Sequence, residues 1–203
     1  TLHSWSGIGV AESLSASAID QIASREHIAR RIGKAKVLII DEISMLSAGV
    51  LEAADAVCRE VRRAGADVPF GGLPVVLVGD FFQLPPVSKN RETAFCYESA
   101  TWRALNPLTC YLTEQYRQDD TAYLDVLSAI RSGDVGELHY ERLMARRFTE
   151  EPVPREAPKL FSHNADVDRL NADELKKLPG NARSYRMSST GRHWTRSRLR
   201  TCR

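Results

Sequence analysis

Two short apolar runs in this sequence each end in residues that could take part in nucleotide hydrolysis. Residues 37–41 end in Asp41, which Glu42 follows, and residues 73–80 end in Gly79-Asp80. In a parallel sheet, ligands gather beyond the carboxyl ends of the strands. There, one carboxylate can hold a hydrated Mg²⁺ ion while the next polarises the attacking water, because successive strand residues point in different directions. We assign Asp41 to the metal and Glu42 to the water; the alternative is a solvated strand end without a catalytic role.

The second run continues as Gly-Asp-Phe-Phe-Gln-Leu-Pro-Pro-Val at residues 79–87. The neutral amide of Gln83 could hydrogen-bond both a γ-phosphate oxygen and the attacking water, and so report the presence of the third phosphate. Alternatively, Leu-Pro-Pro stiffens a loop that Gln83 caps. Phe82 could stack on a nucleic-acid base. At least one of Phe81 and Phe82 should pack in the core, since alternation sends neighbouring side chains to opposite faces.

The elements that position these residues are predicted to follow a strand–helix–strand order. Both apolar runs are typical of strands buried on both faces, and the apolar residues from Val50 to Val61 fall on one helix face that Gly65 should end. This order implies a parallel sheet. Elsewhere we predict helical structure over 11–34, 121–131 (with Gly133 as C-cap) and from Asn164, as its cap, to Leu178, strands at 109–112 and 159–162, and a loop-rich stretch at 85–107.

Several segments, in the correct order, resemble motifs of the PIF (petite integration frequency) helicases of superfamily 1, which are relatives of RecD. Residues 41–45 (Asp-Glu-Ile-Ser-Met) are similar to motif II and residues 79–87 to motif III. Residues 1–9 resemble motif Ia, a strand-and-turn segment in that family, and residues 112–118 resemble motif IV. Residues 160–171 resemble the segment that opens the second RecA-like domain of these helicases.

The resemblance implies an α/β fold. A RecA-like P-loop NTPase domain with a parallel sheet would occupy residues 1–110, and a connecting region with the start of a second RecA-like domain would occupy residues 111–187. The stretch from Asn181 to Arg203 holds seven Arg and no acids, and from Ser188 onward it shows neither helical nor strand periodicity. We expect residues 188–203 to form a non-native or disordered basic tail; the alternative is a basic nucleic-acid-binding arm.

The same resemblance implies an ATP-dependent DNA helicase that uses ATP and Mg²⁺ and moves 5′ to 3′ along single-stranded DNA. Its partners would be single-stranded DNA and DNA junctions, in replication, repair, recombination or telomere maintenance. Arg117 would reach the γ-phosphate, a role that suits the planar, permanently charged fork of Arg. His3 and Ser4 of motif Ia would contact DNA.

The phosphate-binding loop of such enzymes requires G-x-x-x-x-G-K-[ST]. The only Gly-Lys pair here is Gly33-Lys34, which Ala35 follows, and Ile28 stands where the first Gly should be. In the family that loop precedes motif Ia, so we expect the loop and its strand upstream of Thr1, and an inactive chain without them. The alternatives are a RecD-type or transposon-borne helicase, or a non-enzymatic, degenerate nucleic-acid-binding remnant.

The charge and the cysteine content limit the kinds of metal site and the cellular compartment that we expect. The chain carries 28 basic and 26 acidic residues, whereas residues 1–180 alone have a net charge of −5. Its four cysteines form no C-x-x-C pair, so a zinc site is not expected and a reducing, intracellular compartment is. No apolar run approaches the length of a membrane span. We therefore expect an intracellular protein without a membrane partner, and a monomer.

Overall fold

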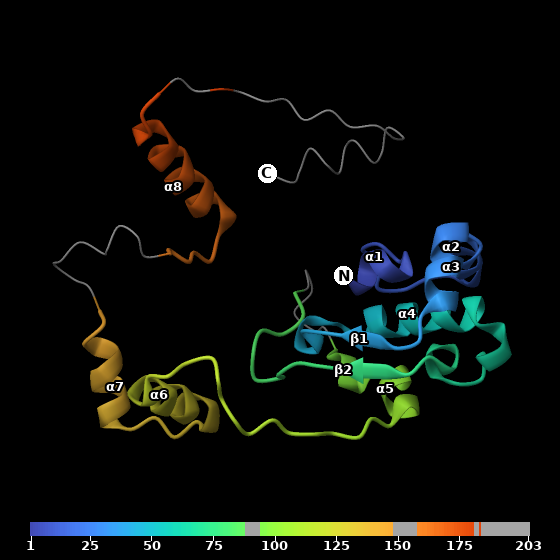
Figure 1. The fold of residues 1–203 in the computed structure, drawn as a ribbon, viewed down its shortest axis with the longest axis horizontal. Coiled ribbons are helices and arrows are strands. Elements are labelled where there is room, and N and C mark those ends of the chain that lie inside the picture. Colours follow the sequence, from blue (N-terminus) through green and yellow to red (C-terminus); the bar gives the residue numbers. More distant parts are fainter. Residues whose placement is uncertain (88–93, 148–157, 181–182, 184–203) are drawn as a thin grey trace. The chain divides into compact units, whose positions relative to one another are not determined.

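The computed structural model describes residues 1–87, 94–147, 158–180 and 183 (Figure 1). They divide into two compact units, Thr1–Met144 and Ala145–Arg203. No described helix has the length and apolar composition needed to cross a membrane. The tail predicted at residues 188–203 lies outside the described residues. In the first unit the helices are α1 (Leu2–Ser6), α2 (Ala16–Ala23), α3 (Glu26–Lys34), α4 (Ala48–Val61), α5 (Ala100–Leu105), α6 (Thr121–Ser132) and α7 (Glu137–Met144), and the second unit contains α8 (Asn164–Lys177).

A parallel strand–helix–strand unit lies at the centre of the first unit, as predicted. Strands β1 (Leu38–Ile40) and β2 (Val75–Leu77) pair in parallel, and α4 connects them. The Ser47 hydroxyl caps α4 by accepting a hydrogen bond from the Val50 amide at 3.4 Å. The helix ends at Val61 with Arg62 as its C-cap, three residues before Gly65, because the backbone of Arg62 leaves the helical region; Gly65 belongs to the following 3₁₀ turn.

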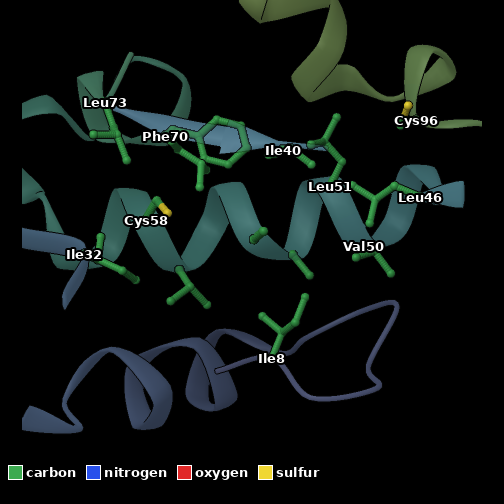
Figure 2. Close-up of a cluster of buried hydrophobic side chains, with 14 of the residues drawn as sticks. Ile8, Ile32, Ile40, Leu46, Val50, Leu51, Cys58, Phe70, Leu73 and Cys96 are labelled. Carbon is green, nitrogen blue, oxygen red and sulfur yellow. The ribbon is translucent and has the colours of Figure 1, made fainter. Parts of the chain in front are cut away.

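The core of this unit surrounds α4. Leu51, Val57 and Cys58 of this helix are fully buried. Figure 2 shows Ile40 and Phe70 on one side of α4 and Ile8 on the other. Helices α1, α2 and α3 therefore cover one side of α4, and the two strands lie on its opposite side (Figure 1).

The prediction that both strands are buried on both faces is wrong for the described part of the chain. Leu38 and Ile40 face α4 and are buried, whereas Ile39 is 62% exposed and Val76, its register partner, is 45% exposed. Described elements cover only the face that packs against α4. The two apolar runs therefore predicted the strands correctly, but they did not show whether one or both faces of each strand are buried.

Buried polar contacts join α4 to the elements that follow it. The Asp55 carboxylate is almost completely buried and accepts hydrogen bonds from the Phe70 amide at 2.5 Å and the Thr101 hydroxyl at 3.0 Å. It also forms an ion pair with Arg59 at 2.9 Å. Because a buried carboxylate is costly without such partners, these bonds fix the chain near Phe70 and α5 against α4.

Other predicted elements differ in detail. The helical stretch predicted at 11–34 forms two helices, because Arg25 between them has an extended backbone, with φ −71° and ψ 116°. Gly133 ends α6 in the left-handed conformation, with φ 75°, as predicted. Asn164 is the first residue of α8 and its cap is His163. Residues 109–112 and 159–162 form no strand, since no described strand pairs with them, and the stretch expected to be loop-rich contains α5.

Candidate functional site

The backbone brings motif II and motif III together at the carboxyl ends of the two strands. The Val78 amide donates to the Ile40 carbonyl at 2.8 Å, and the Ile43 amide donates to the Val78 carbonyl at 3.0 Å. Asp41 and Glu42 occupy the turn between these two bonds, and both are exposed. The Asp41 Oδ1 atom accepts a hydrogen bond from the Glu42 amide at 2.9 Å. The predicted pair of carboxylates therefore lies next to the start of motif III.

Glu42 has a left-handed backbone, with φ 53° and ψ 47°. For a residue with a Cβ atom this conformation costs about 1–2 kcal/mol, and such strain is concentrated at active sites and switch regions. The next two residues, Ile43 and Ser44, are buried and hold the turn in place. The backbone of Glu42 thus departs from the strand conformation immediately after Asp41.

Gly79 of motif III lies close to this turn. A Cβ atom at this position would lie 2.9 Å from both the amide nitrogen and the Cγ2 atom of Ile43. Real Cβ atoms do not approach a backbone nitrogen this closely, so only glycine allows motif III to pack against the motif II turn. Motif III therefore needs a glycine at position 79 because any side chain there would collide with Ile43.

We expect Gly79→Ala to destabilise the chain by about 1–3 kcal/mol, the usual cost of overpacking. The matched control is Gly33→Ala in α3, where an added Cβ meets nothing within 4 Å. Replacing glycine inside a helix should instead stabilise the chain by about 1 kcal/mol. Urea unfolding of both variants measures the difference. Equal stability of the two variants would contradict the close packing of motifs II and III.

The motif III turn is organised by Asp80. Its Oδ1 atom accepts from the Phe82 amide at 3.1 Å, and its Oδ2 atom accepts from the Gln83 side-chain nitrogen at 3.3 Å. The backbone N–H of Gln83 also donates a hydrogen bond to the backbone carbonyl of Asp80 at 3.0 Å. Asp80 therefore sets the direction of the Gln83 side chain, which is exposed beyond the strand end.

The two phenylalanines of motif III point to different environments, as expected from alternation. Phe81 makes edge contacts with the rings of Phe95, Tyr97 and Trp102 at centroid distances of 5.0–6.2 Å. Phe82 is 79% exposed. Phe81 is partly buried and packs against the core, which confirms the prediction that at least one of the two does so, and exposed Phe82 is the one that could meet a base.

Arg131, at the end of α6, contacts this turn and was not predicted from the sequence. Its guanidinium makes a two-pronged ion pair with Asp80, with one N–O distance of 3.1 Å, and lies 5.1 Å from the centroid of the Phe82 ring. The hydrogen bond from Arg131 lowers the pKa of the Asp80 carboxyl. The pair therefore stabilises the fold at neutral pH, and this contribution is lost as the pH falls through the lowered pKa. No local signal could have found it, because 51 residues separate the two.

The remaining predicted residues lie apart from this strand end. Arg117 is exposed in the extended segment between α5 and α6, and within the described residues it makes no hydrogen bond or ion pair. His3 and Ser4 lie in α1, so the expected strand-and-turn is a helix and a turn. The Thr1 hydroxyl caps this helix, and Gly7 ends it with φ 81°. Ser4 is exposed, and His3 is partly exposed.

The residues at the strand ends fit a hydrated divalent cation. Mg²⁺ usually takes one or two carboxylates together with waters and substrate phosphates, and exposed Asp41 offers oxygen ligands of this kind. The described residues contain no cluster of three His, Cys, Asp or Glu side chains that could enclose a metal by themselves. Gly33 and Lys34 lie inside α3 and so form no phosphate-binding loop.

Cysteine chemistry is not favoured at the two buried thiols. Burial raises the pKa of Cys58 to about 12 and that of Cys96 to about 11. A thiol with so high a pKa carries almost no thiolate at neutral pH, and thiolate is the nucleophilic form. The carboxylates at the strand ends remain the stronger candidates for chemistry.

The amino-acid sequence is similar to those of known helicases. ATP-dependent DNA helicase PIF1 of Danio rerio is 38% identical over 189 residues, which cover 91% of this chain and 29% of that protein. ATP-dependent DNA helicase RRM3 of Saccharomyces cerevisiae is 35% identical over 193 residues, which cover 92% of this chain and 26% of that protein. The chain therefore spans between a quarter and a third of the length of these relatives.

Solved structures agree with the sequence matches. The Pif1 helicase from Candida albicans superposes with a TM-score of 0.81 at 29% identity, over 99% of this chain and 46% of that one. The Pif1 helicase from Bacteroides in complex with ADP-AlF3 and ssDNA gives a TM-score of 0.69 at 29% identity, over 89% of this chain and 44% of that one. The model of the PIF1-like helicase family matches residues 1–138. This chain belongs to the PIF1-like helicase family and has its RecA-like α/β fold.

Proposed function

We propose that this chain forms part of the motor of an ATP-dependent DNA helicase. The observation that carries the proposal is the junction of motif II and motif III, where Asp41, Glu42 and Gln83 follow the ends of two parallel, hydrogen-bonded strands. This is the edge of an α/β sheet at which nucleotides bind. Membership of the PIF1-like helicase family supports the same role.

Each residue at this edge would have a separate task in ATP hydrolysis. Asp41 would hold Mg²⁺, which supplies charge neutralisation at the phosphates when bound. Glu42 would orient the attacking water and accept its proton. Gln83, whose side chain Asp80 holds in place, would hydrogen-bond the γ-phosphate or the water. Arg117 would neutralise the charge that develops during phosphoryl transfer.

The partner of the motor would be DNA. Exposed Phe82 offers a surface on which a base can stack, and exposed Ser4 with His3 offers polar contacts to a strand. The Bacteroides helicase that this chain resembles was solved with ssDNA. We propose single-stranded DNA and DNA junctions as partners, 5′-to-3′ movement, an intracellular location and a monomeric motor. The proposed processes are replication, repair, recombination or telomere maintenance.

The test uses the chain extended upstream by a phosphate-binding loop and downstream by the rest of the second domain. We expect DNA-stimulated ATP hydrolysis and duplex unwinding, and we expect Glu42→Gln to lower turnover by about 10²–10⁴-fold while nucleotide still binds. The control Glu12→Gln makes the same chemical change at another exposed position and should leave turnover unchanged. An extended parent protein that binds DNA but never hydrolyses ATP would favour a non-enzymatic remnant instead.

A further inference from the structure

A group of basic side chains on α3 has no part in the proposed hydrolysis. Residues 25–36 hold five Lys or Arg side chains and one acid, Glu26, although residues 1–180 as a whole are net acidic. Four members of this segment, His27, Arg30, Arg31 and Lys34, are spaced i, i+3, i+4 and i+7 and therefore share one side of the helix. We call these four residues the basic stripe.

The basic stripe faces away from the core. The apolar residues of α3, Ile28 and Ile32, point to another side of the helix and are buried. Arg30 and Lys34 are exposed, and neither forms an ion pair with any described acid. The Lys and Arg residues on α4, α6, α7 and α8 each form an ion pair with an Asp or Glu side chain, whereas within the described part of the chain no member of the basic stripe does.

One member of the basic stripe connects it to motif Ia. The Arg31 guanidinium donates a hydrogen bond to the Ser4 carbonyl at 3.0 Å. Helices α1 and α3 are in contact and lie side by side above α4 (Figure 1). The bond fixes the basic stripe next to the helix that carries His3 and Ser4, the proposed DNA contacts. A single DNA strand that runs from α1 toward α3 would therefore meet Arg30 and Lys34, which lie one helical turn apart.

We propose that the basic stripe is a further DNA-binding surface, which contacts the phosphate backbone of the single strand beyond motif Ia. The inference rests on the proposed function, because the partner is the same DNA. Phosphates are the strongest counter-charges available to exposed Arg and Lys, and neutralising them releases bound counterions. The segment from Arg25 to Lys36 has no Phe, Tyr or Trp on which a base could stack. This surface would therefore add affinity without a preference for sequence.

The test measures how salt weakens the binding of the 203-residue chain to fluorescein-labelled single-stranded oligothymidine. The variant Arg30→Ala/Lys34→Ala removes two contacts, so the slope of log affinity against log salt should become shallower by about 1.4. If the affinities converge near 1 M salt, binding at 0.1 M salt should weaken by about 25-fold. Arg30→Lys/Lys34→Arg should keep the parent slope. Both changed positions are exposed and alanine favours helices, so α3 should stay folded.

The matched control is Lys176→Ala/Lys177→Ala on α8, which changes the net charge equally but at lysines that already pair with Asp173 and Glu174. It should retain the parent slope, and the arginines after Asn181 are the same in every variant. The inference is overturned, and the proposed function is not, if Arg30→Ala/Lys34→Ala keeps the parent slope. The same holds if Lys176→Ala/Lys177→Ala makes the slope as shallow as Arg30→Ala/Lys34→Ala does. A parent chain that does not bind the oligonucleotide overturns both the inference and the DNA-binding part of the proposed function.

Discussion

Arg117→Ala, in the chain extended to include a phosphate-binding loop and the rest of the second domain, should slow ATP hydrolysis by about three orders of magnitude or more. Nucleotide affinity should stay nearly unchanged. An arginine that acts on the transferred phosphate stabilises charge that grows only as the transition state is approached, so its loss lowers turnover more than binding. Arg117 is exposed and makes no hydrogen bond or ion pair within the described residues, which leaves its guanidinium available for this role.

Steady-state ATP hydrolysis with saturating single-stranded DNA, together with nucleotide binding by fluorescence, would measure both quantities. Arg117→Lys should recover little activity, because an ammonium group cannot form the paired hydrogen bonds of a guanidinium. Arg146, a second exposed arginine without an ion pair in the described part of the chain, provides the control, and Arg146→Ala should leave turnover unchanged. Turnover of Arg117→Ala within about twofold of the parent would remove Arg117 from the mechanism.

The second large effect is expected from the 203-residue chain itself, which should not hydrolyse ATP. Phosphoryl transfer depends almost entirely on positioning and electrostatic stabilisation, which require a phosphate cradle as well as the metal, the water and the neutralising arginine. Of the groups proposed for this chemistry the chain contains Asp41, Glu42, Gln83 and Arg117, but it contains no G-x-x-x-x-G-K-[ST] segment. Its one Gly-Lys pair lies inside α3, where the backbone amides are committed to the helix.

Purified residues 1–203 should be assayed with Mg²⁺, ATP and saturating single-stranded DNA. Addition of the upstream segment should restore nucleotide binding, and addition of the downstream segment should restore turnover. Glu42→Gln in the bare chain serves as the control for contaminating activity. Hydrolysis at an ordinary enzymatic rate by the bare chain, abolished by Glu42→Gln, would show that this account of the phosphate site is wrong.

The sequence by itself determined the elements whose signals are local. The apolar runs that end at Asp41 and Asp80 indicated two parallel strands, and the periodic residues from Val50 to Val61 indicated the helix between them. Gly133 marked the end of α6 because few other residues adopt its positive φ so easily. Motif order indicated the family. Each of these signals depends on a few neighbouring residues, so it can be seen without knowing what packs where.

Only the tertiary structure decided how these elements meet. The left-handed turn at Glu42 and the close approach of Gly79 to Ile43 depend on strand pairing between segments about forty residues apart. The ion pair of Asp80 with Arg131 joins residues 51 positions apart, and no periodicity connects them. The strands' exposed faces and the assignment of Phe81 to the core and Phe82 to solvent likewise depend on neighbours distant in sequence. Local patterns report which conformation a segment prefers, whereas burial and ion pairing depend on distant segments that the folded chain brings together.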